Sequence, residues 1–284
     1  VKYNRTWTGE SNNTQFARET DTCLRLDTAI QVCESWADAY HSGLVDVPLT
    51  MYENSTDTEV LLVGGGDFIA ANHLRNHSVS VDQVDIDGEF LDYAKNDSFL
   101  RRYNDGAWTY EHLSVYERDI YAYLQQTDRQ YDLILLDLPG AKSDEMLNLY
   151  SVSFYEMLRS HLTDRGVLVT WGYSKYIYGQ HYKAYMNTVA EAGFTQKAGY
   201  SAYDDFNHDG ETQRGERFYM LAPDDDRPTP LPGAGTAYVE RYADRYRQIE
   251  WRPTPTYDGV RPNRVFHPNY NIIVETRLPD DSNQ

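Results

Sequence analysis

A glycine-rich turn follows a short apolar segment in the first third of the chain. Residues 60–63 are all apolar and run directly into three consecutive glycines, Gly64, Gly65 and Gly66. A turn without Cβ atoms lets the backbone approach a bound ligand closely. A dinucleotide fingerprint needs a further glycine at position 69, where this chain has Ile69. The turn therefore favours a nucleoside without a pyrophosphate, bordered by Gly64 and Gly66.

Acidic residues stand near the ends of the strand segments that follow. Asp85 and Asp87 come about 20 residues after the glycines, where a carboxylate can accept both ribose hydroxyls. We predict this role for Asp85 and a helix cap for Asp87. Asp119 follows the next strand, where such folds hold the adenine edge. Asp137 ends the most apolar strand, 131–138, and partial removal from water there suits it to proton transfer.

The elements that must position these residues alternate between strand and helix patterns. Apolar strand segments end near residues 64, 86, 117, 138 and 171, and helical patterns stand between them. Such alternation predicts an α/β fold, with a parallel sheet covered by helices on both faces. Two further strands, 194–203 and 217–222, have no helix between them. This closing hairpin predicts a Rossmann-like, seven-stranded methyltransferase-type sheet.

The rest of the chain suggests two smaller parts. Alternating apolar residues around Asp27 and Thr28 predict a two-stranded hairpin over 22–33, and residues 48–57 resemble a polar connector. We therefore predict an N-terminal β-hairpin domain with its connector at 1–57. A Rossmann-like nucleoside-binding catalytic domain is predicted at 58–223, and a C-terminal extension at 224–284.

The composition restricts the class of protein. The formal net charge is −18, with 28 Asp and only 6 Lys. Such a surface argues against nucleic-acid binding and is typical of proteins that work in high salt. The chain contains no apolar run long enough to span a bilayer, and its first residues are too polar for a signal peptide.

The remaining reactive side chains do not indicate another chemistry. Cys23 and Cys33 flank the predicted hairpin and could pair, but buried free thiols are the expected state in the cytosol. Eight histidines show no metal-ligand spacing, so no metal is predicted. Ser151 has no neighbouring pattern of a hydrolase and is predicted to cap a helix.

Several motifs together resemble the spermidine synthase (polyamine aminopropyltransferase) family over residues 22–222. The resemblance is carried by the segments 26–31 (Leu-Asp-Thr-Ala-Ile-Gln), 39–41 (Ala-Tyr-His), 64–67 (Gly-Gly-Gly-Asp), 84–87 (Val-Asp-Ile-Asp), 137–139 (Asp-Leu-Pro) and 149–155 (Leu-Tyr-Ser-Val-Ser-Phe-Tyr). It implies transfer of an aminopropyl group from decarboxylated S-adenosylmethionine to an amine, with methylthioadenosine released. No tightly bound cofactor is implied.

The resemblance also implies roles for individual residues. Gln31, Asp85 and Asp119 would hold the nucleoside of the co-substrate. Tyr40, His41 and Asp67 would border the pocket of the amine acceptor. Asp137 would help take a proton from the acceptor ammonium, and Tyr40 is predicted to be a second catalytic residue.

The chain departs from the family pattern mainly on the acceptor side. The family's Asp-Glu pair ahead of Tyr40 is replaced by Trp36 and Ala37, and its second acid after Asp137 is Gly140. The last glycine of the family's turn is replaced by Phe68, and its Trp-Gly-Phe segment reads Gly-Glu-Arg-Phe at 215–218. Asp144 or Glu145 could substitute for the missing acid, although a solvated loop is their simpler environment.

Two rival functions remain open at this point. One is a methyltransferase on the same fold that uses S-adenosylmethionine itself, and the other is a non-catalytic nucleoside-binding domain. The tail at 260–273 resembles that of relatives fused behind a membrane segment, which implies such a segment ahead of this chain. A cytoplasmic location, either free or at the cytoplasmic face of a membrane, and a homodimer or homotetramer complete the expectations.

Overall fold

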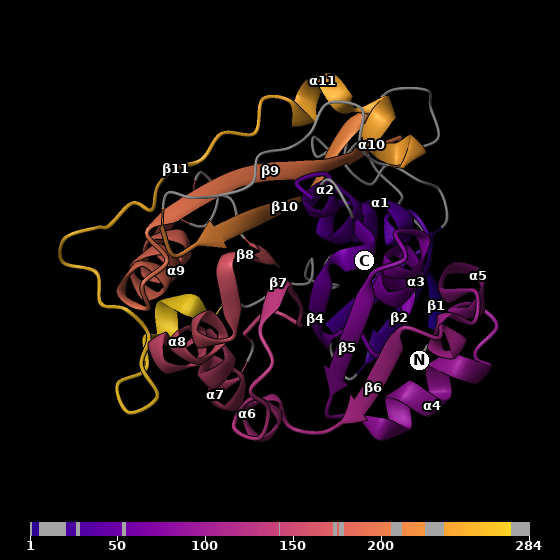
Figure 1. Ribbon diagram of the computed structural model, residues 1–284, viewed down its shortest axis with the longest axis horizontal. Coiled ribbons are helices and arrows are strands. Elements are labelled where there is room, and N and C mark those ends of the chain that lie inside the picture. The colour runs from indigo at the N-terminus through magenta and orange to yellow at the C-terminus, as the bar shows by residue number, and fades with distance from the viewer. Residues whose placement is uncertain are drawn as a thin grey trace, which may run out of the picture.

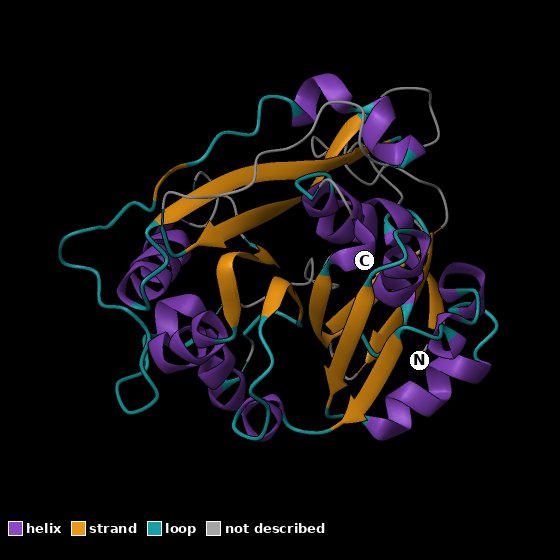
Figure 2. Cartoon of the chain, in the orientation of Figure 1, coloured by secondary structure: helices purple, strands orange, loops and turns teal. Residues whose placement is uncertain are grey.

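The computed structural model describes residues 2–5, 21–26, 29–52, 55–141, 143–172, 175, 179–205, 212–224 and 236–273. They form a large sheet between two layers of helices, with a small antiparallel sheet in addition (Figure 1; Figure 2).

The large sheet has the strand order of the methyltransferase fold. Its order is β11-β9-β10-β8-β7-β4-β5-β6, and β10 runs antiparallel to both of its neighbours. The predicted parallel sheet with a closing hairpin is thus confirmed, whereas the edge strand β11 was not predicted, because two residues carry no periodicity. The strands are β4 (Glu59–Gly64), β5 (Ser80–Asp85), β6 (Leu113–Glu117), β7 (Tyr131–Asp137), β8 (Leu162–Trp171), β9 (Gln196–Asp204), β10 (Gln213–Ala222) and β11 (Arg252–Pro253).

Helices cover both faces of this sheet, as Figure 1 shows. Leu61 and Val63 of β4 pack with one group of helices, α6, α8 and α9, while Val60 and Leu62 pack on the opposite face. Burial on both faces explains why the central strands are apolar without alternation. The helices between β4 and β9 are α3 (Ile69–Asn76), α4 (Gly88–Asn96), α5 (Arg101–Asn104), α6 (Ile120–Leu124), α7 (Asp144–Leu147), α8 (Val152–Ser160) and α9 (Gly179–Glu191). Short 3₁₀ turns lie at Ser55–Asp57, before β4, and at Ala107–Thr109, Asn148–Tyr150 and Tyr270–Ile272.

The connection into the large sheet is helical and buried. It consists of α1 (Ala37–His41), a π-helical turn η2 (Ser42–Asp46) and α2 (Val47–Leu49). The prediction of a polar connector over 48–57 is therefore wrong for its first residues. Leu49 and Met51 are 3% and 4% exposed, because they pack on the sheet face that also carries Val60 and Leu62.

The small sheet contains the predicted hairpin and one additional strand. β2 (Asp21–Leu26) pairs with β3 (Ala29–Cys33), and β1 (Lys2–Arg5) pairs with the outer edge of β2. Cys23 and Cys33 are directly opposite each other, with their Cα atoms 4.0 Å apart, and form a disulfide. The expectation of free thiols is wrong, because the register of the hairpin brings the two sulfur atoms together.

Removal of this disulfide should lower stability measurably. The bridge closes a loop between residues ten positions apart, and a loop of that length contributes about 2–3 kcal/mol through the entropy of the unfolded chain. We expect the double variant Cys23→Ser/Cys33→Ser to lose that much in urea unfolding. A double variant as stable as the wild type would show that the bridge does not constrain the unfolded chain.

Part of the C-terminal extension is anchored to the helices. After α10 (Ala237–Arg241) and α11 (Ala243–Tyr246), the chain returns to the sheet, where the amide of Asn263 donates to the carbonyls of Leu147 (2.7 Å) and Tyr150 (2.9 Å). Ile272 is fully buried in the same core. The domain boundaries at 57 and 223 stay predictions. Among the residues described, no helix is both long enough and apolar enough to cross a membrane.

Candidate functional site

The glycine turn lies against the end of strand β7. Gly64 pairs with Asp137 across β4 and β7, and the amide of Gly65 donates to the Asp137 carbonyl (3.3 Å). Gly64 has a φ of +85°, and a Cβ added there would lie 2.3 Å from the same carbonyl oxygen. Only glycine meets both conditions. The turn therefore brings Asp137 close to the backbone that follows β4.

A buried glutamine supports the turn from below. Gln83 of β5 is 0% exposed, and its amide donates to the carbonyls of Gly64 (3.1 Å) and Gly65 (2.7 Å). We did not predict this residue. Its signal in the sequence is a polar side chain inside an otherwise buried strand, which must find hydrogen-bond partners.

Phe68 replaces the glycine of the family pattern at a left-handed position. Its φ is +63°, a conformation that costs an ordinary residue about 1–2 kcal/mol. Its ring is fully buried and packs against Trp108 (centroids 5.9 Å apart). Burial of a phenyl ring contributes more than this strain costs, so the turn keeps its shape despite the substitution.

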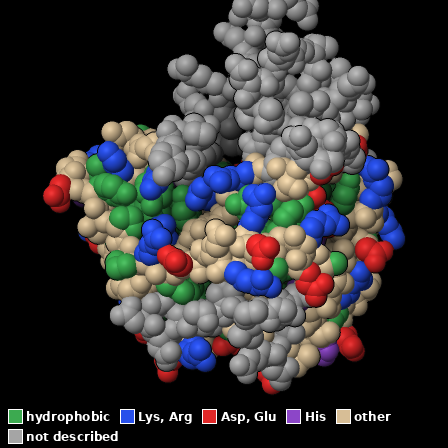
Figure 3. Space-filling view, turned by 90° about the horizontal axis from the view of Figure 1, so that it is seen from above, with side chains coloured by type: hydrophobic (Ala, Val, Ile, Leu, Met, Phe, Trp, Pro, Cys, Tyr) green, Lys and Arg blue, Asp and Glu red, His purple; other side chains and the backbone are tan. Residues whose placement is uncertain are grey.

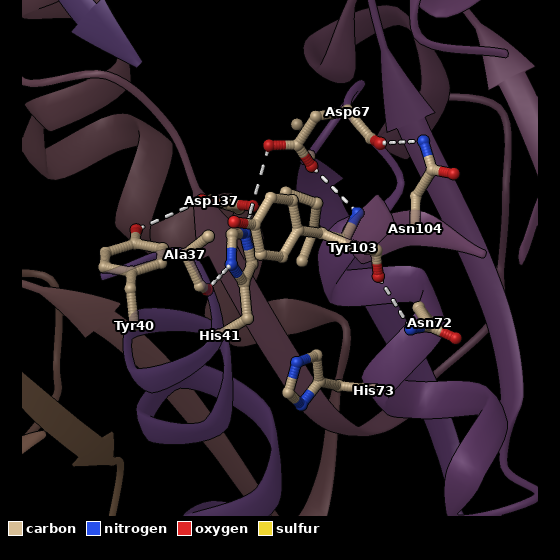
Figure 4. A network of polar contacts seen from close by, with 12 residues as sticks. Ala37, Tyr40, His41, Asp67, Asn72, His73, Tyr103, Asn104 and Asp137 are labelled. Atoms are coloured by element: carbon tan, nitrogen blue, oxygen red, sulfur yellow. Dashed lines mark hydrogen bonds and ion pairs between the residues drawn. The ribbon is translucent and has the colours of Figure 1, made fainter. Parts of the chain in front are cut away.

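Asp137 and Tyr40, both predicted to be catalytic, are in direct contact (Figure 4). The Tyr40 hydroxyl donates to Asp137 Oδ1 at 3.1 Å. Burial, followed by the charge of Asp137, holds the pKa of the Tyr40 phenol well above its usual value. Tyr40 therefore remains a hydrogen-bond donor, and Asp137 is the member of the pair that can accept a proton.

His41 and Asp67 complete a compact group with Asp137. His41 Nε2 lies 3.6 Å from Asp137 Oδ2 and 4.0 Å from Asp67 Oδ2, while its Nδ1 donates to the Ala37 carbonyl (2.5 Å). Burial alone would lower the pKa of His41, but the hydrogen bond to Asp137 and the charges of both acids raise it to about 9. An imidazolium thus occupies the space between two carboxylates.

The same three residues have the geometry of a cation site. One ligand atom of each, from His41, Asp67 and Asp137, lies within 4.8 Å of the others. Burial raises the pKa of Asp67 to about 6, so Asp67 can be ionised at neutral pH. Because a protonated His41 has no free ring nitrogen, the two carboxylates are the groups that could hold a cation such as an ammonium.

Helix α3 holds His41 in place from the other side. The His73 ring stacks on the His41 ring, with centroids 6.1 Å apart (Figure 4). The buried carboxylate of Asp46 bonds His73 Nδ1 (3.0 Å) and His77 Nε2 (2.8 Å), and so joins the π-helical turn to α3. This contact fixes the short helix that carries Tyr40 and His41.

Of the two acids at the end of strand β5, Asp87 caps a helix as predicted, and Asp85 lies near the glycine turn. Asp85 is half-buried and lies under Gly66, where an added Cβ would come within 2.8 Å of its Oδ2. Burial raises the pKa of Asp85. Asp87 caps α4 by accepting from the Phe90 amide (2.9 Å). Asp85 is thus the acid that faces the glycine turn.

Other predicted residues lie further from this group. Asp119 is exposed and caps α6 through the Ala122 amide (3.0 Å). Gln31 is half-buried in β3, next to Val32, which belongs to the same apolar cluster as Phe68. Asp144 is exposed at the start of α7. The side chain of Glu145 lies outside the described residues.

Glu216 is an acid of the site that we did not single out. The pairing of β10 with β9 shifts register between Arg214 and Arg217, and such an irregularity re-aims a side chain. Two residues on, Phe218 packs against Tyr40 (centroids 5.4 Å apart). Glu216 is solvent-accessible, yet crowding by protein atoms raises its pKa, and its charge also acts on Tyr40. It therefore lies close enough to Tyr40 to act on it electrostatically.

The protonated His41 predicts a stability that depends on pH. Its pKa rises from 6.5 to about 9 on folding, so its contribution is complete below pH 6.5 and is lost as the pH rises through 9. Asp67, whose pKa is about 6, releases its remaining proton near the lower limit of this window and adds little slope above it. We expect the wild type to lose roughly 3 kcal/mol, relative to His41→Gln, between these limits in urea unfolding. If the free energy of unfolding depends on pH in the same way in both proteins, His41 is not charged in the folded state.

Taken together, the fold and the site define a class of protein. It is an α/β protein of the methyltransferase type, with acidic side chains gathered around a glycine turn at the carboxyl ends of β4, β5 and β7. This is the edge at which open α/β sheets bind their ligands.

Comparison with known proteins defines the family. The sequence model of the spermine/spermidine synthase domain matches residues 37–203. The polyamine aminopropyltransferase 2 of Aquifex aeolicus is 27% identical over 175 residues, which is 60% of this chain and 34% of that protein. The polyamine aminopropyltransferase of Saccharolobus solfataricus is 30% identical over 188 residues, covering 65% and 61% of the two chains. The chain belongs to the spermine/spermidine synthase family.

Solved structures agree on the fold. The spermidine synthase from Thermotoga maritima superposes with a TM-score of 0.58 at 17% identity, over 90% of this chain and 79% of that one. A spermidine synthase in complex with the transition state analogue AdoDATO gives the same TM-score at 16% identity and the same coverage. The chain spans about a third of the length of two curated relatives, the polyamine aminopropyltransferase 2 of Aquifex aeolicus and the polyamine aminopropyltransferase of Oceanobacillus iheyensis.

Proposed function

We propose that this chain transfers an aminopropyl group from decarboxylated S-adenosylmethionine to an amine. The observation that carries the proposal is the position of Asp137. Its carboxylate is held by Tyr40 and lies beside the glycine turn and Asp67. A base and a cation-binding group are therefore next to the strand ends at which a nucleoside would bind.

The proposed reaction needs one proton transfer and one displacement. Asp137 accepts a proton from the acceptor ammonium, which leaves a lone pair on the nitrogen. The nitrogen attacks the carbon next to the sulfonium, the C–S bond breaks, and its electrons stay on sulfur. Neutral methylthioadenosine leaves, and Asp137 later returns its proton to water. Because the sulfonium is already a good leaving group, alignment and deprotonation are the main tasks of the protein.

The residues proposed to bind the nucleoside lie mainly at the carboxyl ends of the strands. Asp85 would accept the ribose hydroxyls beside Gly66, and Gly64 would leave room for the ligand to approach the backbone. Gln31 and Asp119 are proposed to complete the pocket. For Asp119 this would combine with its role as a helix cap, since its second carboxylate oxygen remains available.

The acceptor half differs from the family pattern, and we propose that Glu216 compensates. Its charge acts on Tyr40, and a carboxylate there can hold the far ammonium of an amine acceptor. Asp67 and His41 would border the near end. Gly140, in the position of the family's second acid, makes this substitution necessary for a diamine.

The role of Glu216 can be measured through substrate affinity. We expect Glu216→Gln to raise KM for the amine about tenfold while kcat changes little, because a charged hydrogen bond common to ground and transition states is lost. Asp144→Asn, the same change on an exposed residue of α7, should leave both constants unaltered. If Asp144→Asn raises KM instead, the acceptor is bound by the loop after Asp137.

The identity of the donor separates the proposal from its nearest rival. Each donor is to be incubated with enzyme and a panel of amines, and the nucleoside product identified by mass spectrometry. Decarboxylated S-adenosylmethionine should yield methylthioadenosine. Formation of S-adenosylhomocysteine from S-adenosylmethionine would mean that the protein is a methyltransferase.

Three further expectations belong to the proposal. A homodimer or homotetramer and a membrane segment ahead of residue 1 follow from the resemblance to the family. We propose the cytoplasm, or the cytoplasmic face of a membrane, as the location, because a nucleoside co-substrate is available there. The Cys23–Cys33 disulfide is the observation that opposes a strongly reducing compartment.

A further inference from the structure

A cavity lies on the face of the sheet opposite to the face that packs against Tyr40. It has a volume of ≈ 270 Å³ and lies over β9, β10 and β11. Its lining residues include four cations, which are Lys175, Lys197, Arg217 and Arg252. The view from above in Figure 3 shows several Lys and Arg side chains on the visible face, interspersed with hydrophobic and acidic ones. Such a concentration is unusual in a chain with only 6 Lys and a net charge of −18.

Two cations of this basic pocket, Lys197 and Arg217, have no acidic partner among the described residues. Arg252 pairs with Glu250 at 2.8 Å, and Glu250 is the one acid in the lining. Within the described part of the chain, neither Lys197 nor Arg217 makes a side-chain ion pair. Burial, and then Arg217, Lys175 and Arg252, lower the pKa of Lys197 to about 8. Like charges at close range are unfavourable unless an anion joins them.

Uncharged residues also line the basic pocket and determine its shape. Lys197 Nζ lies over the Tyr219 ring, 5.1 Å from its centroid. Gly199 leaves the floor open, since an added Cβ would lie 3.5 Å from Tyr219 and 3.7 Å from Lys197 Nζ. Gln248 and Tyr182 supply neutral polar groups. The volume is slightly below that of common drug-sized sites, so a small ligand fits better than a polymer.

We propose that this basic pocket binds a small polyanion of the phosphate type, with Lys197 and Arg217 as its principal ligands. An arginine guanidinium matches the geometry of phosphate oxygens, and a lysine ammonium supplies a point charge beside it. Arg217 stands between Glu216 and Phe218 in sequence, and these two residues face the candidate active site from the other side of β10. The proposal does not depend on aminopropyl transfer.

Binding of inorganic pyrophosphate to the purified protein tests this directly. Titration calorimetry in potassium chloride of constant ionic strength should show saturable binding at one site. Lys197→Met and Arg217→Met should each weaken binding at least tenfold. Lys95→Met removes the same charge from α4, where Lys95 pairs with Asp92, and should bind like the wild type. Weakening by Lys95→Met to the same degree would mean that only the net charge matters, and would overturn the proposal.

A second variant tests the shape without a change in charge. Gly199→Ile adds a β-branched side chain, which a strand tolerates, to the floor of the pocket. We expect it to abolish pyrophosphate binding while far-ultraviolet circular dichroism and methylthioadenosine binding stay unchanged. Binding that persists in Gly199→Ile would place the anion elsewhere. If wild-type protein shows no saturable binding, but sedimentation shows an oligomer that Lys197→Met dissociates, the face is an interface between copies and the proposal is wrong.

The pH dependence of pyrophosphate binding tests the role of Lys197 separately. A bound anion favours the charged amine, so affinity for pyrophosphate should fall as the pH rises above about 8. Lys197→Arg keeps its charge in this range and should lack that decline. The other charged groups of the lining are Lys175, Arg217, Arg252 and Glu250, and the phenols of Tyr182 and Tyr219 have raised pKa values and stay neutral. Equal pH profiles for wild type and Lys197→Arg would exclude Lys197 as a ligand.

Discussion

Replacement of Asp137 by Asn should lower kcat for aminopropyl transfer by roughly 10²–10⁴-fold. Asn fills the same volume and still accepts the hydrogen bond from Tyr40, but it cannot take a proton from the acceptor ammonium. Affinity for methylthioadenosine should stay near that of the wild type, because the carboxylate acts on the amine. Steady-state kinetics together with calorimetric binding of methylthioadenosine measures both effects.

Asp87→Asn is the matched control for this loss. Asp87 also follows a strand end, and Asn can cap α4 as Asp does, so its kinetics should be unchanged. Raising the pH supplies free amine and should recover part of the rate of Asp137→Asn. An Asp137→Asn enzyme with the wild-type rate would remove Asp137 from the role of base.

Replacement of Gly64 by Ala should destabilise the protein by about 3 kcal/mol. The new methyl group would lie 2.3 Å from the Asp137 carbonyl oxygen, at a residue whose φ is +85°. The turn must move away from β7, so the paired position of Asp137 is lost as well. We expect lower stability in urea unfolding and a lower kcat in the same variant.

Gly106→Ala is the control that separates the cost of a positive φ from the cost of the steric clash at Gly64. Gly106 has a φ of +71°, and an added Cβ there would meet nothing within 4 Å. It should cost about 1 kcal/mol and leave kcat unchanged. Equal losses in the two variants would mean that the contact between Gly64 and Asp137 does not determine the position of the catalytic acid.

The strand ends explain why much of the site could be predicted from the sequence. Parallel strands bring their carboxyl ends to one edge, so Gly64, Asp85 and Asp137 had to meet there once the alternation of strands and helices was recognised. Tyr40 was singled out by its place in a family motif, and the structure shows in addition that it contacts Asp137.

Contacts between distant segments account for what the sequence did not show. The charge on His41 depends on two acids from distant parts of the chain, Asp67 in the turn after β4 and Asp137 at the end of β7. Glu216 reaches the site through an irregularity in strand pairing, which has no periodic signal. The disulfide depends on the register of a hairpin, which the expectation of a reducing compartment obscured.

The basic pocket was missed for a related reason. Lys197, Arg217 and Arg252 are separated widely in sequence, and they converge only because β9, β10 and β11 are neighbours in the sheet. A count of charges showed an acidic chain and concealed the local excess of cations. The expectation of a high-salt environment stays a prediction, and it sets the conditions for the activity measurements.

The most direct test of the account is the stoichiometry of products in molar potassium chloride. Enzyme is to be incubated with decarboxylated S-adenosylmethionine and putrescine, agmatine or spermidine, and both products quantified by mass spectrometry. We predict equal amounts of methylthioadenosine and of one aminopropylated amine, and neither product with Asp137→Asn on the same time scale. Tight binding of methylthioadenosine without any aminopropylated amine would contradict the account and identify a nucleoside-binding domain that has lost catalysis.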